Sequence, residues 1–97
     1  MVATAPQGVT VFDRDDAGFF DWLDQNPDGY FLNTARNPTP QTHVMLHLSS
    51  CSHIGREDRA EYTRKRVKLC SGQRVPLEQW AVRYTGDKPA LCRSCFS

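Results

Sequence analysis

The four cysteines of this 97-residue chain are the residues whose chemistry is easiest to specify. Cys92 and Cys95 are separated by two residues, a spacing at which two thiolates can bind one metal ion from a tight turn. Thiolates select Zn²⁺ over harder cations, and a structural zinc site needs four ligands arranged as a tetrahedron. The sequence therefore predicts a zinc site whose ligands are Cys51, Cys70, Cys92 and Cys95.

Other interpretations of the cysteines stay open at this point. His47, four residues before Cys51, is an alternate ligand; with it, Cys70 would be a small buried hydrophobic residue. Two disulfides would also fit the even count. However, the first residues lack the basic and apolar regions of a secretion signal, which predicts a cytoplasmic location where thiols stay reduced. A redox-active C-x2-C would need a strand before it and a helix after it.

The sequence carries no motif of a known catalytic apparatus. A zinc deaminase needs a glutamate two residues after a histidine, and none follows His43, His47 or His53 in that way. Neither a glycine-rich phosphate loop nor a G-x-S-x-G motif is present. Four protein ligands would leave zinc no open position for water, as in structural sites. We therefore expect a protein that is not an enzyme and has no small-molecule substrate.

The net charge of +1 hides a division along the chain. Residues 1–35 hold six aspartates and one arginine, a formal charge of −5, whereas residues 36–97 hold eleven bases and five acids, a charge of +6. A segregated basic half predicts a polyanionic partner, DNA or another nucleic acid. The predicted phosphate contacts lie in the basic segment 56–74 and are Arg56, Arg59, Arg64, Lys65, Arg66 and Lys68.

Polar residues outside the basic segment are candidates for contacts with bases. Asn33, Arg36 and Asn37 follow or end a predicted strand, and His43 and His47 are expected on the outward face of another. Tyr62 could stack on a base or sugar. For each of these residues, an ordinary solvated or packed position would explain the sequence equally well.

Hydrophobic periodicity predicts the elements that position these residues. Val9 and Val11 alternate in a short strand, and Phe19, Trp22 and Leu23 repeat at helical spacing. Strands are predicted at 8–12, 30–34, 42–48 and 66–70, and helices at 15–25 and 76–86. The result is one α+β domain over residues 1–97, with a small antiparallel sheet of three to four strands, two helices and a zinc-stapled C-terminal tail without regular structure.

Several motifs in this order resemble a known type of domain. They are Gly29-Tyr30-Phe31-Leu32-Asn33-Thr34, Val44-Met45-Leu46-His47-x3-Cys51-x2-Ile54, Lys68-Leu69-Cys70, the helix with Trp80 and the final C-x2-C. Over residues 20–96 the chain resembles a small cysteine/histidine zinc-binding domain of actinobacterial proteins, sometimes linked to modification-dependent restriction nucleases. The resemblance implies a zinc-containing accessory module that engages DNA.

Two functions from different classes are thus expected. The first is a zinc-stabilised DNA-binding domain that uses residues 56–74, as an accessory module of a restriction or defence system. The alternative is a protein-interaction or regulatory module whose acidic helix, within residues 13–28, docks a larger protein. No apolar run is long enough to cross a bilayer, so no membrane partner is expected.

Overall fold

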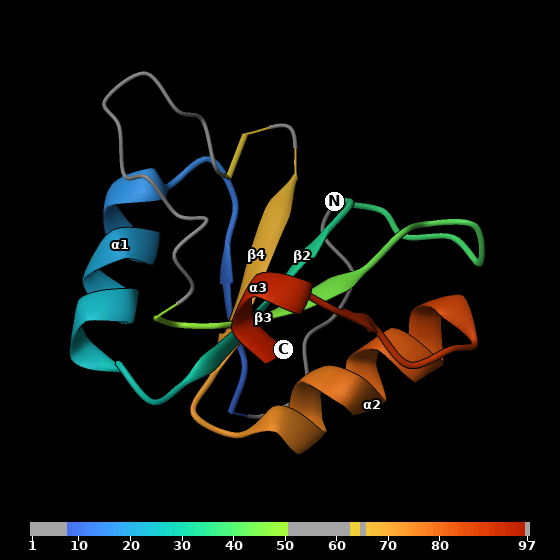
Figure 1. Ribbon diagram of the computed structural model, residues 1–97. Helices are drawn as coiled ribbons and strands as arrows, with labels where there is room; N and C mark the ends of the chain where they lie inside the picture. Colours follow the sequence, from blue (N-terminus) through green and yellow to red (C-terminus); the bar gives the residue numbers. More distant parts are fainter. Residues whose placement is uncertain (1–7, 51–62, 65, 97) are drawn as a thin grey trace.

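The structure is a computed structural model that describes residues 8–50, 63, 64 and 66–96; for Ser94 and Cys95 only the backbone is described. A five-stranded sheet forms its centre, with the two longer helices on opposite sides (Figure 1). In chain order the elements are β1 (Thr10–Phe12), α1 (Asp16–Gln25), β2 (Tyr30–Thr34), β3 (Met45–Leu48), β4 (Val67–Ser71), α2 (Arg74–Thr85), β5 (Ala90–Leu91) and α3 (Arg93–Phe96).

The strand order is β1-β4-β2-β3-β5, and only the last pair, β3 with β5, is parallel. One row across the sheet is important for the site. Cys70 on β4 is the register partner of Phe31 on β2, and Phe31 is in turn the partner of His47 on β3. Because side chains on a strand alternate between faces, these three residues share one face of the sheet.

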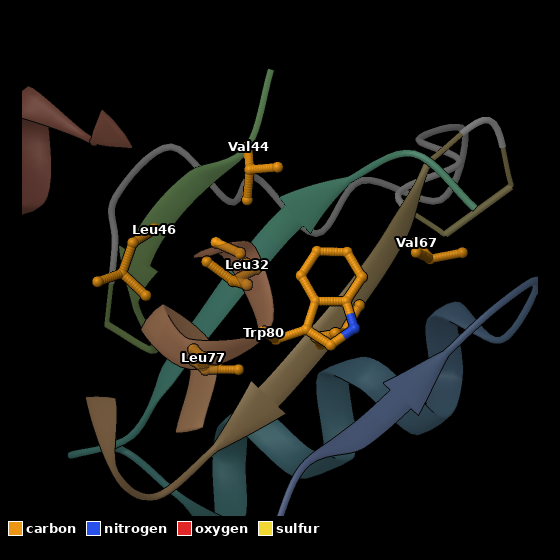
Figure 2. Close-up of a cluster of buried hydrophobic side chains, with 8 residues drawn as sticks. Leu32, Val44, Leu46, Val67, Leu77 and Trp80 are labelled. Atoms are coloured by element: carbon orange, nitrogen blue, oxygen red, sulfur yellow. The ribbon is translucent and has the colours of Figure 1, made fainter. Parts of the chain in front are cut away.

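Each face of the sheet has its own hydrophobic core. The α1-side core is built from Phe19, Leu23, Phe31 and Cys70. The α2-side core is built from Leu32, Val44, Leu46, Val67, Leu69, Leu77, Trp80 and Ala81, with the Trp80 indole lying against the strands (Figure 2). Adjacent residues such as Phe31 and Leu32 thus belong to different cores. This explains why β4 is buried on both faces along its whole length.

The local sequence sets the ends of both longer helices. Asp15 caps α1, because its Oδ1 accepts a hydrogen bond from the Gly18 N–H at 2.9 Å. Pro27 follows the last turn and cannot continue the helix. Gly86 ends α2 with a φ of 82°, a left-handed conformation that glycine adopts without steric cost.

The sequence predicts the α+β class and the two helices correctly, but three details are wrong. The sheet has five strands and is mixed, not three or four antiparallel strands. The tail, predicted without regular structure, adds β5 and α3. His47 does not face outward, since its side chain is only 8% exposed and stacks on Phe31, with ring centroids 4.8 Å apart.

Neither α1, α2 nor α3, the helices of the described residues, is long and apolar enough to cross a lipid bilayer.

Candidate nucleic-acid interface and metal ligands

Four arginines gather at the end of the sheet where β1 and β2 finish and β4 begins. We call Arg14, Arg36, Arg64 and Arg66 the arginine cluster. Arg36 Nη2 donates a hydrogen bond to the Arg64 carbonyl at 2.7 Å, which joins the β2–β3 loop to the segment before β4. Arg66 Nη1 lies 3.4 Å from the His43 carbonyl. Residues far apart in sequence therefore bring four guanidinium groups together here, with Arg14, Arg64 and Arg66 exposed to solvent.

Arg36 has a structural role within this cluster. Its Nε and Nη2 donate to the two carboxylate oxygens of Asp13 at 2.8 and 2.6 Å, a bidentate pair that fixes the guanidinium plane. Hydrogen bonding from Arg36 lowers the pKa of Asp13, and the same bond raises the pKa of Arg36. Arg36 thus holds the Arg64 backbone in place. Because its guanidinium is engaged in these bonds, Arg36 is less available for the contact with a base that the sequence predicts.

A surface hollow of about 390 Å³ lies beside the cluster and is lined by Arg14, Asp16, Thr63 and Arg64. Arg14 comes from the turn between β1 and α1, and its side chain is 64% exposed. Its backbone φ is 56°, the left-handed region that is uncommon for a residue with a side chain. Two cationic side chains therefore border one concave surface.

Lys68 and Asn33, both predicted to contact nucleic acid, interact with each other instead of facing solvent. Lys68 Nζ donates to Asn33 Oδ1 at 2.8 Å, and the lysine is 6% exposed on the α1 side of the sheet. Burial, assisted by the charge of Arg66 and opposed by that of Asp16, lowers the pKa of Lys68 to about 8. This lysine is positioned to affect the stability of the fold more than to bind a phosphate.

The Lys68 pKa predicts a rise of stability with pH. Its folded value of about 8 lies below the ordinary 10.5, so between these values the unfolded chain binds more protons and the free energy of unfolding increases with pH. From pH 7 to pH 9 we expect the wild type to gain about 1 kcal/mol relative to the K68M variant. Urea unfolding at pH 7, 8 and 9 measures the difference. Parallel pH profiles for the two proteins would contradict the assignment.

The predicted metal ligands Cys70 and Cys92 are not brought together. Cys92 follows β5, and its N–H donates to the Leu46 carbonyl at 3.0 Å, so the β3–β5 register continues to it. Strands β2 and β3 separate β4 from β5, which puts roughly 14 Å between the two cysteine backbones at the usual strand spacing. Zinc binds sulfur at about 2.3 Å, so one ion cannot reach both thiolates.

Burial also sets Cys70 apart from a metal ligand. Its side chain is fully buried in the α1-side core, beside Phe31. Burial strongly raises the pKa of the Cys70 thiol, with a smaller opposing effect of Lys68, so the group stays protonated. Zinc binds the thiolate form. Cys70 therefore fits the alternative role of a small hydrophobic core residue.

The backbones of His47 and Cys92 do lie close together. The register pairs Met45 with Ala90 and Leu46 with Leu91, and the Cys92 N–H donates to the carbonyl of Leu46, the residue before His47. His47 and Cys92 are both buried. Within residues 8–50, 63, 64 and 66–96, no group of three or more His, Cys, Asp or Glu side chains is placed to hold a metal ion. His47 and Cys92 therefore supply at most half of a four-ligand site from the part that is described.

Several predicted site residues lie outside the described residues. These are Cys51, Arg56, Arg59, Tyr62 and Lys65, and the side chain of Cys95 is likewise not described. Conversely, the prediction missed Arg14, which is the single base of an acidic stretch. The preceding Asp13 and following Asp15 and Asp16 suggested a helix start, and no sequence signal indicated that Arg14 would lie next to Arg64.

Comparisons of this chain with protein families, with curated proteins and with solved structures found no match.

Proposed function

We propose that this protein is a non-enzymatic nucleic-acid-binding domain whose arginine cluster contacts the phosphate backbone of DNA. The observation that carries the proposal is the convergence of Arg14, Arg64 and Arg66 on one exposed end of the sheet. Two segments far apart in the sequence contribute these residues, and Arg36 joins them from a third, so the surface exists only in the folded protein. The resemblance to domains linked to restriction nucleases points in the same direction, toward an accessory module.

The chemistry of arginine suits this role. Its guanidinium stays charged at every physiological pH and donates several hydrogen bonds in a plane that matches phosphate oxygens. Phosphate contacts release condensed counterions, so they supply most of the affinity and make it fall steeply with salt. We therefore expect binding of limited sequence preference that is governed by ionic strength.

The test compares two double variants by titrating a labelled duplex at several salt concentrations. R64A/R66A removes two exposed charges from the arginine cluster, and R83A/K88A removes two exposed charges near the far end of α2. We expect R64A/R66A to weaken binding at least tenfold. It should also reduce the slope of log affinity against log salt by about 2, because two phosphate contacts are lost.

The control variant removes the same number of positive charges from a different place, so it tests whether their position matters. R83A/K88A should keep the affinity within about threefold of the wild type, since long-range effects of exposed charges are screened at physiological salt. An equal loss of affinity in both variants would show that DNA is attracted by the overall charge and not by the arginine cluster. No binding of the wild-type protein at low salt would remove the proposal, and would favour a protein partner for the acidic helix α1.

We further propose that zinc holds the C-terminal tail to β3 through His47, Cys51, Cys92 and Cys95. The support from the structure is the closeness of the His47 and Cys92 backbones, since the Cys92 N–H bonds to the carbonyl of the residue before His47, and the distance of Cys70 from both. The other two ligands come from spacing in the sequence, since Cys51 follows His47 by four residues and Cys95 follows Cys92 by three. Zinc would supply folding free energy here and no catalysis.

A further inference from the structure

Thr63 joins the basic segment to the turn between β1 and α1 through all of its polar groups. Its carbonyl accepts from the Arg14 N–H at 2.8 Å, and its N–H donates to Asp16 Oδ1 at 2.8 Å. Its hydroxyl donates to the same Asp16 oxygen at 2.6 Å and accepts from the Asp15 N–H at 2.7 Å. The residue is fully buried. These four bonds form a clamp that fixes the chain on either side of it.

The clamp holds two arginines against one hollow. Arg64 follows Thr63 directly, and the Arg14 N–H is one of the clamped groups, so both side chains leave from restrained backbone and border the hollow of about 390 Å³. The left-handed φ of 56° at Arg14 costs on the order of 1 kcal/mol, which surrounding contacts must offset. The bond from the Arg14 N–H to Thr63 is one such contact.

The acidic residues at this position are already engaged. Asp16 Oδ1 accepts two hydrogen bonds from Thr63, and its charge interacts favourably with Lys68. Asp15 Oδ1 accepts the N–H of Gly18 as the cap of α1. Their carboxylates are therefore committed to interactions within the protein, and among the described residues the lining of the hollow sets two guanidinium groups against the one carboxylate of Asp16.

We infer that Arg14 and Arg64 form a preordered subsite for one phosphate group of the nucleic-acid backbone, with Thr63 as its positioning residue. The inference rests on the proposed function and deepens it. Preordering matters because the restrained backbone fixes where the two side chains begin, so less conformational freedom is lost on binding than from a flexible loop. One phosphate contacted by both guanidinium groups makes their contributions interdependent.

The experiment is a double-mutant cycle of R14Q and R64Q, with duplex affinity measured by fluorescence anisotropy at fixed salt. We expect each single variant to weaken binding about tenfold. The double variant should lose clearly less than the product of the single losses, because both side chains serve one phosphate. The salt slope should fall by about 1 in the single variants and by no more in the double variant.

Thr63 is tested by comparing T63S, which keeps the hydroxyl, with T63V, which removes it. We expect T63S to bind within about twofold of the wild type and T63V to resemble R14Q in both affinity and salt slope. Where T63V does not fold, the arginine cycle alone decides. If the losses of affinity in R14Q and R64Q multiply in the double variant, or if R14Q binds as tightly as the wild type, the shared subsite is wrong while the proposed function stays intact. Failure of the wild type to bind DNA would instead remove the proposed function itself.

Discussion

The H47A and C92A variants are expected to lose bound zinc and much of their stability, whereas C70A should keep a full equivalent of zinc. A structural zinc site contributes about 10–16 kcal/mol of binding free energy in zinc-finger peptides, as much as the total stability of a typical domain. Removing one ligand should therefore lower the melting temperature by more than about 10 °C. Elemental analysis of the purified proteins gives the zinc content, and circular dichroism gives the melting temperature.

C70A is the matched control because it removes a cysteine from the same row of the sheet. The small cavity left beside Phe31 should lower the free energy of unfolding of C70A by about 1 kcal/mol, with no change in metal content. A wild-type protein without zinc, or a C70A protein that has lost it, would contradict the proposed ligands. Loss of zinc from C70A would instead favour the site with Cys51, Cys70, Cys92 and Cys95.

The W80A variant is expected to lose about 3–5 kcal/mol of stability, enough to unfold a large fraction of the molecules. Trp80 is 2% exposed and fills the α2-side core between the helix and the strands, next to Leu32 and Val67 (Figure 2). Its ring also packs on Tyr84, with centroids 5.0 Å apart. Urea unfolding followed by the fluorescence of the remaining Trp22 measures the loss.

Two controls make this prediction specific. V82A changes a residue of the same helix that is 45% exposed, and should alter stability by no more than about 0.5 kcal/mol. W80F keeps an aromatic ring, and among the described residues the Trp80 Nε1 has no hydrogen-bond partner to lose. W80F should therefore cost less than about 1.5 kcal/mol. A W80A loss no larger than that of W80F would contradict the assignment of Trp80 as the centre of this core.

The elements with a clear period were predictable, whereas the two-residue strand β5 and the four-residue helix α3 were not. The helix predicted at 15–25 is observed as Asp16–Gln25, and the strand predicted at 30–34 is observed with the same bounds. β5 has two residues, too few for any period, and it forms because β3 offers a free edge to the returning chain. Its parallel pairing is a tertiary property that a local pattern does not contain.

The position of His47 shows why face assignment failed at β3. Alternation correctly separates His47 from Leu46, but it does not say that both faces of the sheet are covered. The α1-side core covers the second face at Phe31, and His47 stacks on that ring instead of being presented to solvent. The same covering explains the burial of Lys68.

The charge pattern of the sequence predicted which residues would contact nucleic acid, and the hydrogen bonds of the structure changed that set. The sequence predicted Arg64 and Arg66 as phosphate contacts from the clustering of bases, which needs no knowledge of the fold. It could not identify the bonds of Thr63 to Arg14 and Asp16, which are separated from it by more than 45 residues. Nor could it show that Asp13 engages Arg36. Such pairings depend on where the β1–α1 turn meets β4.

An NMR titration of the ¹⁵N-labelled protein with a short DNA duplex would locate the phosphate-binding surface directly. The proposed interface predicts that the backbone amides of Arg14, Arg36, Arg64 and Arg66 shift progressively, while those of Val75, Val82 and Arg83 on α2 stay in place. Raising the salt concentration should reverse the shifts. Shifts confined to α2 or to the acidic side of α1, or no shifts at low salt, would contradict the assignment of this sheet end as a phosphate-binding surface.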